Sequence, residues 1–240
     1  MSKPLRKTKH FVVLFPGRTG STFVMSALRS HNKIKATGEL IGPLRTAGWD
    51  AQLSAIREWY KVPLLSNERT IGFKTKLVDV VDRDAFRATI EEYDANIVLL
   101  ARDNHVKHVV SRSNAKRLRD TTNRWNRRPG DDELPPISID PQEFAEALLR
   151  VEEHQRDIDA WSAALDRPLL RVTYETLLAQ PQATFDEICR FLGVNPELLE
   201  GRTEKATRDD LTEALANFSE LRGHYAGTQY EAMFDEGVIP

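Results

Sequence analysis

The chain has little of three features that would place it in a specialised class. It has one cysteine, Cys189, which excludes a disulfide framework within the chain and is expected to be a small core residue. The apolar run that precedes Pro16 has only five residues, whereas a secretory hydrophobic region needs about 7–15 and a membrane span about 20. Neither charge dominates, since 34 Lys and Arg face 36 Asp and Glu. We therefore expect a cytoplasmic protein with no membrane span and no general affinity for nucleic acid.

The 240 residues suit a single domain that spans 1–240. Short apolar runs alternate with segments of helical periodicity. The expected strands are 11–15, 34–37, 70–74, 96–101 and 169–173. The expected helices are 21–30, 50–60, 83–93, 104–118, 141–165 and 182–192, followed after 200 by loop and short helices. This order predicts an α/β protein with a P-loop-like three-layer fold, a central and mostly parallel sheet flanked by helices.

Positive charge is concentrated in one part of the chain. Between Arg102 and Arg128 nine Lys or Arg residues face two Asp, so this stretch has a local positive field. A polyanionic ligand or a solvated charged helix would explain it. Residues 120–139, which include Trp125, read as a long flexible or substrate-facing loop. Acceptor recognition, a subunit contact or a solvated mobile loop would each fit that segment.

The most informative stretch is residues 11–22. An apolar run stops at Pro16-Gly17, turns through Arg18-Thr19-Gly20, and enters a helix at Ser21-Thr22. A strand, a glycine turn and a helix N-terminus aim backbone N–H groups and a positive dipole end at one point. Arg18 adds a cation, and the two hydroxyls add donors. The loop predicts an anion site of phosphate or sulfate size, and it lacks the lysine of G-x-x-x-x-G-K-[ST].

Further charged residues follow other expected strands. Arg102 ends a buried strand, with Ser111 about two helical turns into the next helix, and Lys74 ends another strand. Glu39 is a carboxylate shortly after the first helix. In an open α/β sheet, ligands bind at the carboxyl ends of the strands. Two basic strand ends and an anion loop predict a ligand with two separate anionic groups.

With these motifs in this order, nearly the whole chain resembles the sulfotransferase family, which transfers a sulfuryl group from 3′-phosphoadenosine-5′-phosphosulfate. The resemblance implies that residues 16–22 bind the 5′-phosphosulfate, that Arg102 and Ser111 bind the 3′-phosphate, and that Tyr174 lies near the adenine. Ser111 follows Arg102 by nine positions, one more than in the common cytosolic members of the family. The implied donor-binding residues are Pro16, Gly17, Arg18, Thr19, Gly20, Ser21, Thr22, Arg102, Ser111 and Tyr174.

The resemblance also implies catalytic roles for Arg18, Glu39 and Lys74. Lys74-Thr75-Lys76 is similar to the Lys-Thr-His of the cytosolic enzymes, but Lys76 stands at the histidine position, and a lysine is mostly protonated at pH 7. Glu39 matches the glutamate that some bacterial members are thought to use as the base, with His31 in reserve. No metal is expected, because no His/Cys/Asp grouping has zinc-like spacing. The product would be 3′,5′-adenosine bisphosphate.

Two other classes of function stay open from the sequence. A P-loop kinase-like phosphotransferase would need Mg²⁺ and a lysine after the second glycine of the loop, and that lysine is absent. A non-catalytic nucleotide-binding protein of the same fold would keep the loop without the base. The acceptor is open among small-molecule, carbohydrate and lipid hydroxyls or amines, and a homo-oligomer is equally open.

Overall fold

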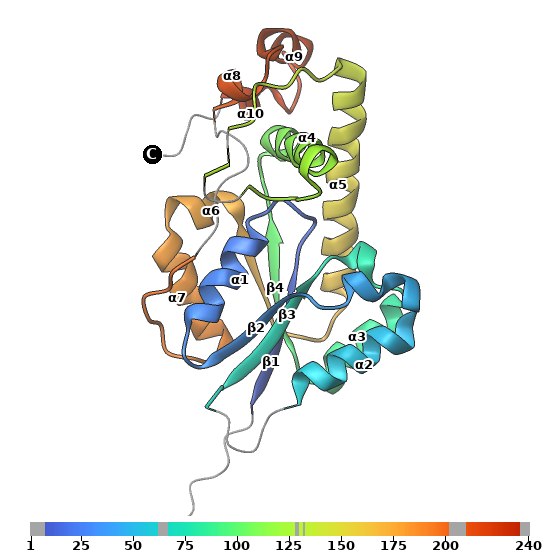
Figure 1. The fold of residues 1–240 in the computed structure, drawn as a ribbon, viewed down its shortest axis with the longest axis vertical. Coiled ribbons are helices and arrows are strands. Elements are labelled where there is room, and N and C mark those ends of the chain that lie inside the picture. Colours follow the sequence, from blue (N-terminus) through green and yellow to red (C-terminus); the bar gives the residue numbers. More distant parts are fainter. Residues whose placement is uncertain (1–7, 62–66, 128–129, 132, 202–209, 236–240) are drawn as a thin grey trace, which may run out of the picture. The chain divides into compact units, whose positions relative to one another are not determined.

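The computed structural model describes residues 8–61, 67–127, 130–131, 133–201 and 210–235 (Figure 1). The chain divides into two compact units. The first, called here the sheet unit, contains 1–101 and 158–202. The second, called here the helical unit, contains 102–157 and 203–240. The single domain expected over 1–240 stays a prediction.

The sheet unit is built on five parallel strands in the order β2-β3-β1-β4-β5. The strands are β1 (Lys9–Leu14), β2 (Ile34–Glu39), β3 (Thr70–Thr75), β4 (Asn96–Ala101) and β5 (Leu169–Thr173). All carboxyl ends of parallel strands lie at one edge, so the segments that follow the strands meet there. This topology confirms the predicted fold class.

Helices cover both faces of this sheet (Figure 1). On one face, α1 (Ser21–Ser30) and α7 (Pro181–Leu192) pack their apolar sides on the strands. On the other face lie α2 (Trp49–Tyr60), α3 (Arg83–Glu92) and the last turns of α5 (Pro141–Ala163). Alternate residues of β1 serve the two cores, as the twofold period of a strand requires.

Short elements complete the connections of the sheet unit. The 3₁₀ turns η1 (Gly42–Ala47) and η2 (Leu77–Asp79) follow β2 and β3, and α6 (Tyr174–Ala179) follows β5. Helix α7 ends at Gly193, whose φ of 77° is the left-handed conformation that favours glycine at a helix end. These three short elements were not predicted, because pieces of three to six residues carry too little periodicity.

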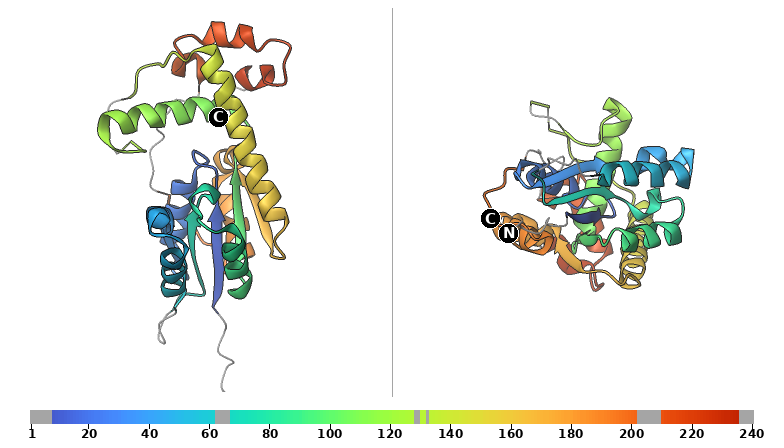
Figure 2. Two further views of the ribbon diagram at one scale, coloured as in Figure 1. Left: turned by 90° about the vertical axis from the view of Figure 1, so that its right-hand side faces the viewer. Right: turned by 90° about the horizontal axis from the view of Figure 1, so that it is seen from below.

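The helical unit has its own apolar core. It contains α4 (His105–Thr122), the first part of α5, α8 (Leu211–Ala214), α9 (Phe218–His224) and α10 (Glu231–Asp235). Figure 2 shows α5 as one uninterrupted helix. Phe144 of α5 packs beside Tyr225 and Phe234, with ring centroids 5.6 and 6.1 Å away. The helices of this unit therefore hold together around aromatic side chains.

The predicted loop over 120–139 is partly wrong. Helix α4 continues to Thr122, and Asn123 ends it in the left-handed conformation with a φ of 56°. Polar residues in the last turn hid this extension, since they give no apolar period. Ile137 forms a parallel bridge with Leu215, so the segment is paired near its end. Residues 128–129 and 132 lie outside the described residues.

Gly72, in the middle of β3, predicts a large stability effect. A Cβ atom there would lie 2.3–2.4 Å from three ring atoms of Phe11, which is fully buried. We expect Gly72→Ala to lower the free energy of unfolding by about 1–3 kcal/mol, the usual cost of overpacking a core. Gly223→Ala is the matched control, because its Cβ meets nothing within 4 Å. Denaturant titration of both variants checks this, and equal stability of the two would contradict it.

Candidate active site

The loop between β1 and α1 has an unusual backbone. Gly17, Arg18 and Gly20 all have positive φ values, of 93°, 58° and 75°. For Arg18 the left-handed conformation costs about 1–2 kcal/mol, so the surrounding loop must impose it. Left-handed residues within a tight turn favour backbone conformations in which neighbouring N–H groups can converge on an anion. The strand, the glycine turn and the helix start follow one another as the sequence predicted, and the anion site stays a prediction.

The loop ends at the exposed N–H groups of a helix. Gly20 caps α1 with no side-chain hydrogen bond, and the first turn of α1 holds no acidic residue. The positive end of the helix dipole is therefore left for an outside anion. The Oγ1 atom of Thr19, a side chain only 1% exposed, has no hydrogen-bond partner among the described residues. A buried hydroxyl without a partner costs stability, and an anion in the loop would accept its hydrogen bond.

Lys74, at the end of β3, brings a cation to the same helix start. Its Nζ donates hydrogen bonds to Ser21 Oγ at 3.2 Å and to Thr22 Oγ1 at 3.1 Å. Burial lowers the pKa of Lys74 to about 8; Glu39 opposes that shift, whereas nearby cations add to it. A buried ammonium among other cations is poorly solvated, so an anionic ligand would stabilise it. Strand β3 thus adds a second cation to the one that Arg18 provides in the loop.

Glu39 reaches this edge of the sheet through a β-bulge. Strand β2 pairs with β3 in register up to Thr37 opposite Phe73, and then Glu39 stands opposite Lys74. Gly38 is the extra residue, and without it Glu39 would take the opposite face of the strand. Residues paired across neighbouring strands share a face. The bulge therefore puts the Glu39 carboxylate on the same face as Lys74.

Lys76 is the direct partner of Glu39. Its Nζ lies 2.6 Å from Glu39 Oε2 and 3.5 Å from Asp79 Oδ2. Lys74 and Lys76 are two residues apart, and both ammonium groups lie over the Phe15 ring, at 5.0 and 5.5 Å from its centroid. The carboxyl ends of β2 and β3 thus combine the predicted base with two lysines.

Tyr174 lies against the loop from the first residue of α6. A Cβ on Gly20 would meet Tyr174 Cδ2 at 3.2 Å and Leu177 Cδ2 at 3.1 Å. The tyrosine ring therefore closes one side of the loop, and only a glycine fits between them. An aromatic ring beside an anion loop is suited to stack on a base attached to the anion.

Arg102 and Ser111 belong to the helical unit. Both side chains are buried, with 7% and 6% of their surface exposed. Arg102 comes directly before the N-terminus of α4, whose cap Asn104 accepts a hydrogen bond from the N–H of Lys107 at 2.7 Å. Ser111 lies within α4. Their role toward a 3′-phosphate stays a prediction.

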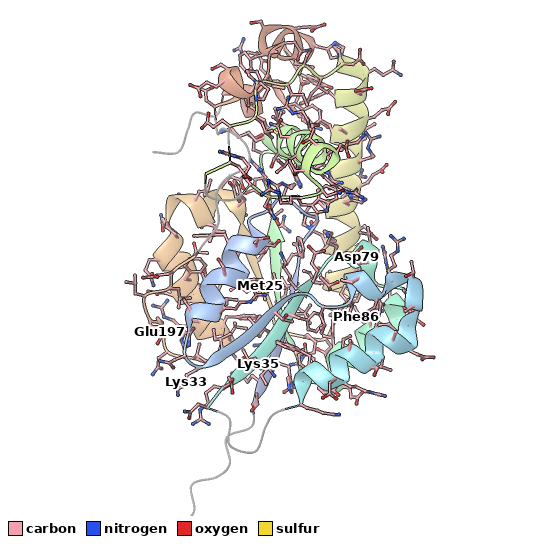
Figure 3. The ribbon with its side chains drawn as sticks, viewed as in Figure 1. Met25, Lys33, Lys35, Asp79, Phe86 and Glu197 are labelled. Carbon is pink, nitrogen blue, oxygen red and sulfur yellow. The ribbon has the colours of Figure 1, made fainter. Side chains whose placement is uncertain are left out.

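His31, the reserve base, has a different environment. Its Nε2 lies 3.0 Å from Asn195 O, and its Nδ1 accepts from the N–H of Lys33 at 2.9 Å. Figure 3 shows Lys33 and Asp79 at opposite ends of the sheet unit. His31 follows the ten-residue helix α1, so about 15 Å separate it from the loop. The structure brings Glu39, not His31, to Lys74.

Sequence reasoning missed Lys76 and Asp79, which form the ion pairs beside Glu39, and Gln52, whose side-chain amide donates to Asp79 O at 2.7 Å. Lys76 was considered only as a residue unable to act as a base. The glycine inside β2 is a sequence signal for a bulge and could have predicted which face Glu39 takes. Gln52 gave no signal, because a glutamine on an amphipathic helix usually faces solvent.

Within the described ranges, no group of three or more His, Cys, Asp or Glu is placed to hold a metal ion. No helix in the part of the chain that the structure describes is long and apolar enough to cross a membrane.

The fold is that of an α/β protein with a P-loop-like arrangement of strand, loop and helix. The model of the sulfotransferase family matches residues 93–197. A sulfotransferase from Alicyclobacillus acidocaldarius shares the fold, with a TM-score of 0.51, 16% sequence identity and 97% of each chain covered. Residues 93–197 are therefore similar to the sulfotransferase family, and the chain as a whole shares its fold with a sulfotransferase.

Relatives in nodulating bacteria match along most of the chain. Nodulation protein H of Rhizobium tropici is 25% identical over 98% of this chain and 96% of its own length. Nodulation protein H of Rhizobium meliloti is 24% identical over 94% of each chain. The similarity therefore extends through both units.

Proposed function

We propose that this protein is a sulfotransferase that takes its sulfuryl group from 3′-phosphoadenosine-5′-phosphosulfate and passes it to a hydroxyl or amine of an acceptor. The observation that carries the proposal is the position of Lys74, whose ammonium group lies at the N-terminus of α1 between two hydroxyls. The unpartnered hydroxyl of Thr19 supports it, since the loop then offers one more donor than the protein uses. A phosphosulfate has the anionic oxygens to accept these hydrogen bonds.

Charge compensation is the main task of the loop in this proposal. Sulfuryl transfer resembles phosphoryl transfer in needing in-line geometry and stabilisation of the leaving and equatorial oxygens. Backbone N–H groups at Gly20 and the side chain of Arg18 would stabilise charge that builds on the bridging oxygen. Lys74 would contact the sulfuryl oxygens as they move. Each such donor is worth about 3–4 kcal/mol when it is removed singly.

Glu39 is assigned the proton of the acceptor. A carboxylate in hydrogen-bond reach of the acceptor hydroxyl or amine typically contributes about 10²–10⁴-fold as a general base. The proton moves to Glu39 as the acceptor oxygen or nitrogen forms its bond to sulfur and the bond between sulfur and the bridging oxygen breaks. The bulge in β2 supports this role, because it places Glu39 opposite Lys74.

The remaining residues would recognise the nucleotide. Tyr174 would stack on the adenine, since its ring lies beside Gly20. Arg102 and Ser111 would bind the 3′-phosphate and so separate this donor from ordinary adenosine nucleotides. The acceptor is proposed to be a small molecule, carbohydrate or lipid that the protein meets in the cytoplasm.

A kinase-like phosphotransferase is the second candidate, and one observation bears on it. Lys74 reaches the helix start from β3, whereas the P-loop lysine of a nucleoside triphosphatase belongs to the loop itself. The loop at 16–22 is shorter than the G-x-x-x-x-G-K-[ST] motif and lacks its lysine, so a cation from a neighbouring strand suits it. The geometry therefore favours sulfuryl transfer over phosphoryl transfer.

Release of labelled sulfate tests the proposal without a known acceptor. The protein is incubated with ³⁵S-labelled 3′-phosphoadenosine-5′-phosphosulfate, and slow transfer to water is measured with and without EDTA. We expect sulfate release that EDTA does not change and that 3′,5′-adenosine bisphosphate inhibits. Turnover of ATP with Mg²⁺, without turnover of the labelled donor, would contradict the proposal.

A further inference from the structure

The Glu39 carboxylate forms an ion pair with Lys76. Lys76 Nζ approaches Glu39 Oε2 at 2.6 Å, and the side chains of the pair are 30% and 36% exposed. Asp79, in η2, approaches the same ammonium at 3.5 Å and is 18% exposed. A Cβ on Gly42 would lie 3.1 Å from Asp79 Oδ2 and 3.7 Å from Glu39 Oε2. The two carboxylates and the lysine therefore form one compact group beside η1.

Gln52 joins the two segments that carry this group. Its side chain is fully buried, and Nε2 donates to Ile41 O at 3.0 Å and to Asp79 O at 2.7 Å. Its Oε1 accepts from the N–H of Val81 at 3.0 Å. The segment after β2 and the segment after β3 are thus tied through one amide. A buried amide with both its donors and its acceptor used holds the backbone on either side in a defined geometry.

We propose that Lys76 is a positioning residue for Glu39. The inference rests on the proposed function, in which Glu39 takes the acceptor proton. Lys76 donates to Oε2, which fixes the carboxylate plane and aims Oε1 at the acceptor. The lysine at the position of the family histidine therefore orients the base from the neighbouring strand instead of acting as the base.

An ordinary surface ion pair serves as the comparison. Lys61 and Glu58 approach to 2.5 Å, yet their side chains are 72% and 73% exposed. Such exposed pairs contribute little, because water and salt screen them. The Lys76 pair is half as exposed, has a second carboxylate, and sits on segments tied by Gln52. A positioning effect is expected there and not at Lys61.

A double-mutant cycle tests the proposal. Sulfate release at saturating labelled donor is measured for Lys76→Met, Glu39→Gln and the combined variant, with Lys61→Met as the matched control. We expect Lys76→Met to lower kcat about 10–100-fold, since misplacing a reacting group by about 1 Å costs that much. The donor KM should change less than kcat. Added to Glu39→Gln, Lys76→Met should lower kcat no further, because its effect acts through that carboxylate.

Two results separate this inference from the proposed function. Suppose that the wild type releases sulfate and that Lys76→Met has the same kcat, or that the combined variant loses the product of the two single reductions in kcat. Lys76 then does not act through Glu39, and only this inference fails. If the wild type neither releases sulfate nor binds 3′,5′-adenosine bisphosphate, the proposed function fails. Lys76→Arg keeps a cation that can reach Glu39, and we expect it to restore most of kcat.

A second measurement covers the case in which Lys76→Met does not fold. Lysines are dimethylated with ¹³C-formaldehyde, and the Lys76 methyl signal is assigned by its loss in Lys76→Arg. We expect Glu39→Gln to shift this signal and Glu58→Gln to leave it in place. If the chemical shift of the Lys76 methyl signal is the same in Glu39→Gln as in the wild type, the proposal is overturned.

Discussion

Glu39→Gln is expected to lower sulfate release about 10²–10⁴-fold, the usual contribution of a general base. The amide is nearly isosteric with the carboxylate and cannot take a proton at neutral pH, so the variant removes the chemistry and keeps the shape. The ion pair with Lys76 becomes a hydrogen bond between an amide oxygen and an ammonium. Sulfate release from labelled donor, measured beside the affinity for 3′,5′-adenosine bisphosphate, checks the prediction.

The control for Glu39→Gln is Glu58→Gln, which removes an exposed carboxylate from a similar ion pair. We expect its sulfate release and its bisphosphate affinity to equal those of the wild type. In Glu39→Gln the bisphosphate affinity should be retained, because no donor of the loop is lost. Sulfate release at the wild-type rate in Glu39→Gln would show that another residue takes the proton.

The second large effect concerns Lys74. Its pKa of about 8 means that the free protein carries the ammonium form below pH 8 and loses it above. A bound anion raises that pKa, so binding above pH 8 must take up a proton. The affinity for the bisphosphate is therefore full below pH 8 and falls by up to about tenfold per pH unit above it. Titrations in buffers of different ionisation enthalpy measure the proton uptake.

Lys74→Met removes the ammonium group as a hydrogen-bond donor. It should also remove the fall in bisphosphate affinity above pH 8. We expect sulfate release to fall about 10²–10³-fold, as when one preorganised donor is lost. Lys35→Met is the control, since Lys35 lies over the Trp59 ring at 4.5 Å and Figure 3 shows it away from Asp79. If the affinity of Lys74→Met for the bisphosphate still falls above pH 8, a group other than Lys74 is responsible for the titration.

Sequence patterns predicted the regular parts of the fold well. Helix α1 and strand β4 have the predicted bounds, 21–30 and 96–101, because apolar runs and a sharp glycine turn delimit them. The end of α4 was missed, since Arg119 to Thr122 are polar and helix ends depend on local backbone contacts. The short 3₁₀ turns were missed because three to six residues carry too little periodicity.

The sequence predicted residues of the candidate site but not which of them contact one another. The loop at 16–22 follows from local chain chemistry, because strand, turn and helix start are contiguous. The contact of Lys74 with Ser21 and Thr22 joins residues more than 50 positions apart, and it depends on the parallel pairing of β1 with β3. The ion pair of Lys76 with Glu39 depends on the bulge at Gly38, which moves one residue to the other face.

The central claim is that the loop between β1 and α1 binds the 5′-phosphosulfate end of an activated sulfate donor. Calorimetric titration of the protein with 3′,5′-adenosine bisphosphate, beside ATP with Mg²⁺, tests it most directly. We predict tight binding of the bisphosphate and none of ATP with Mg²⁺. Binding of ATP with Mg²⁺ and none of the bisphosphate would contradict the claim.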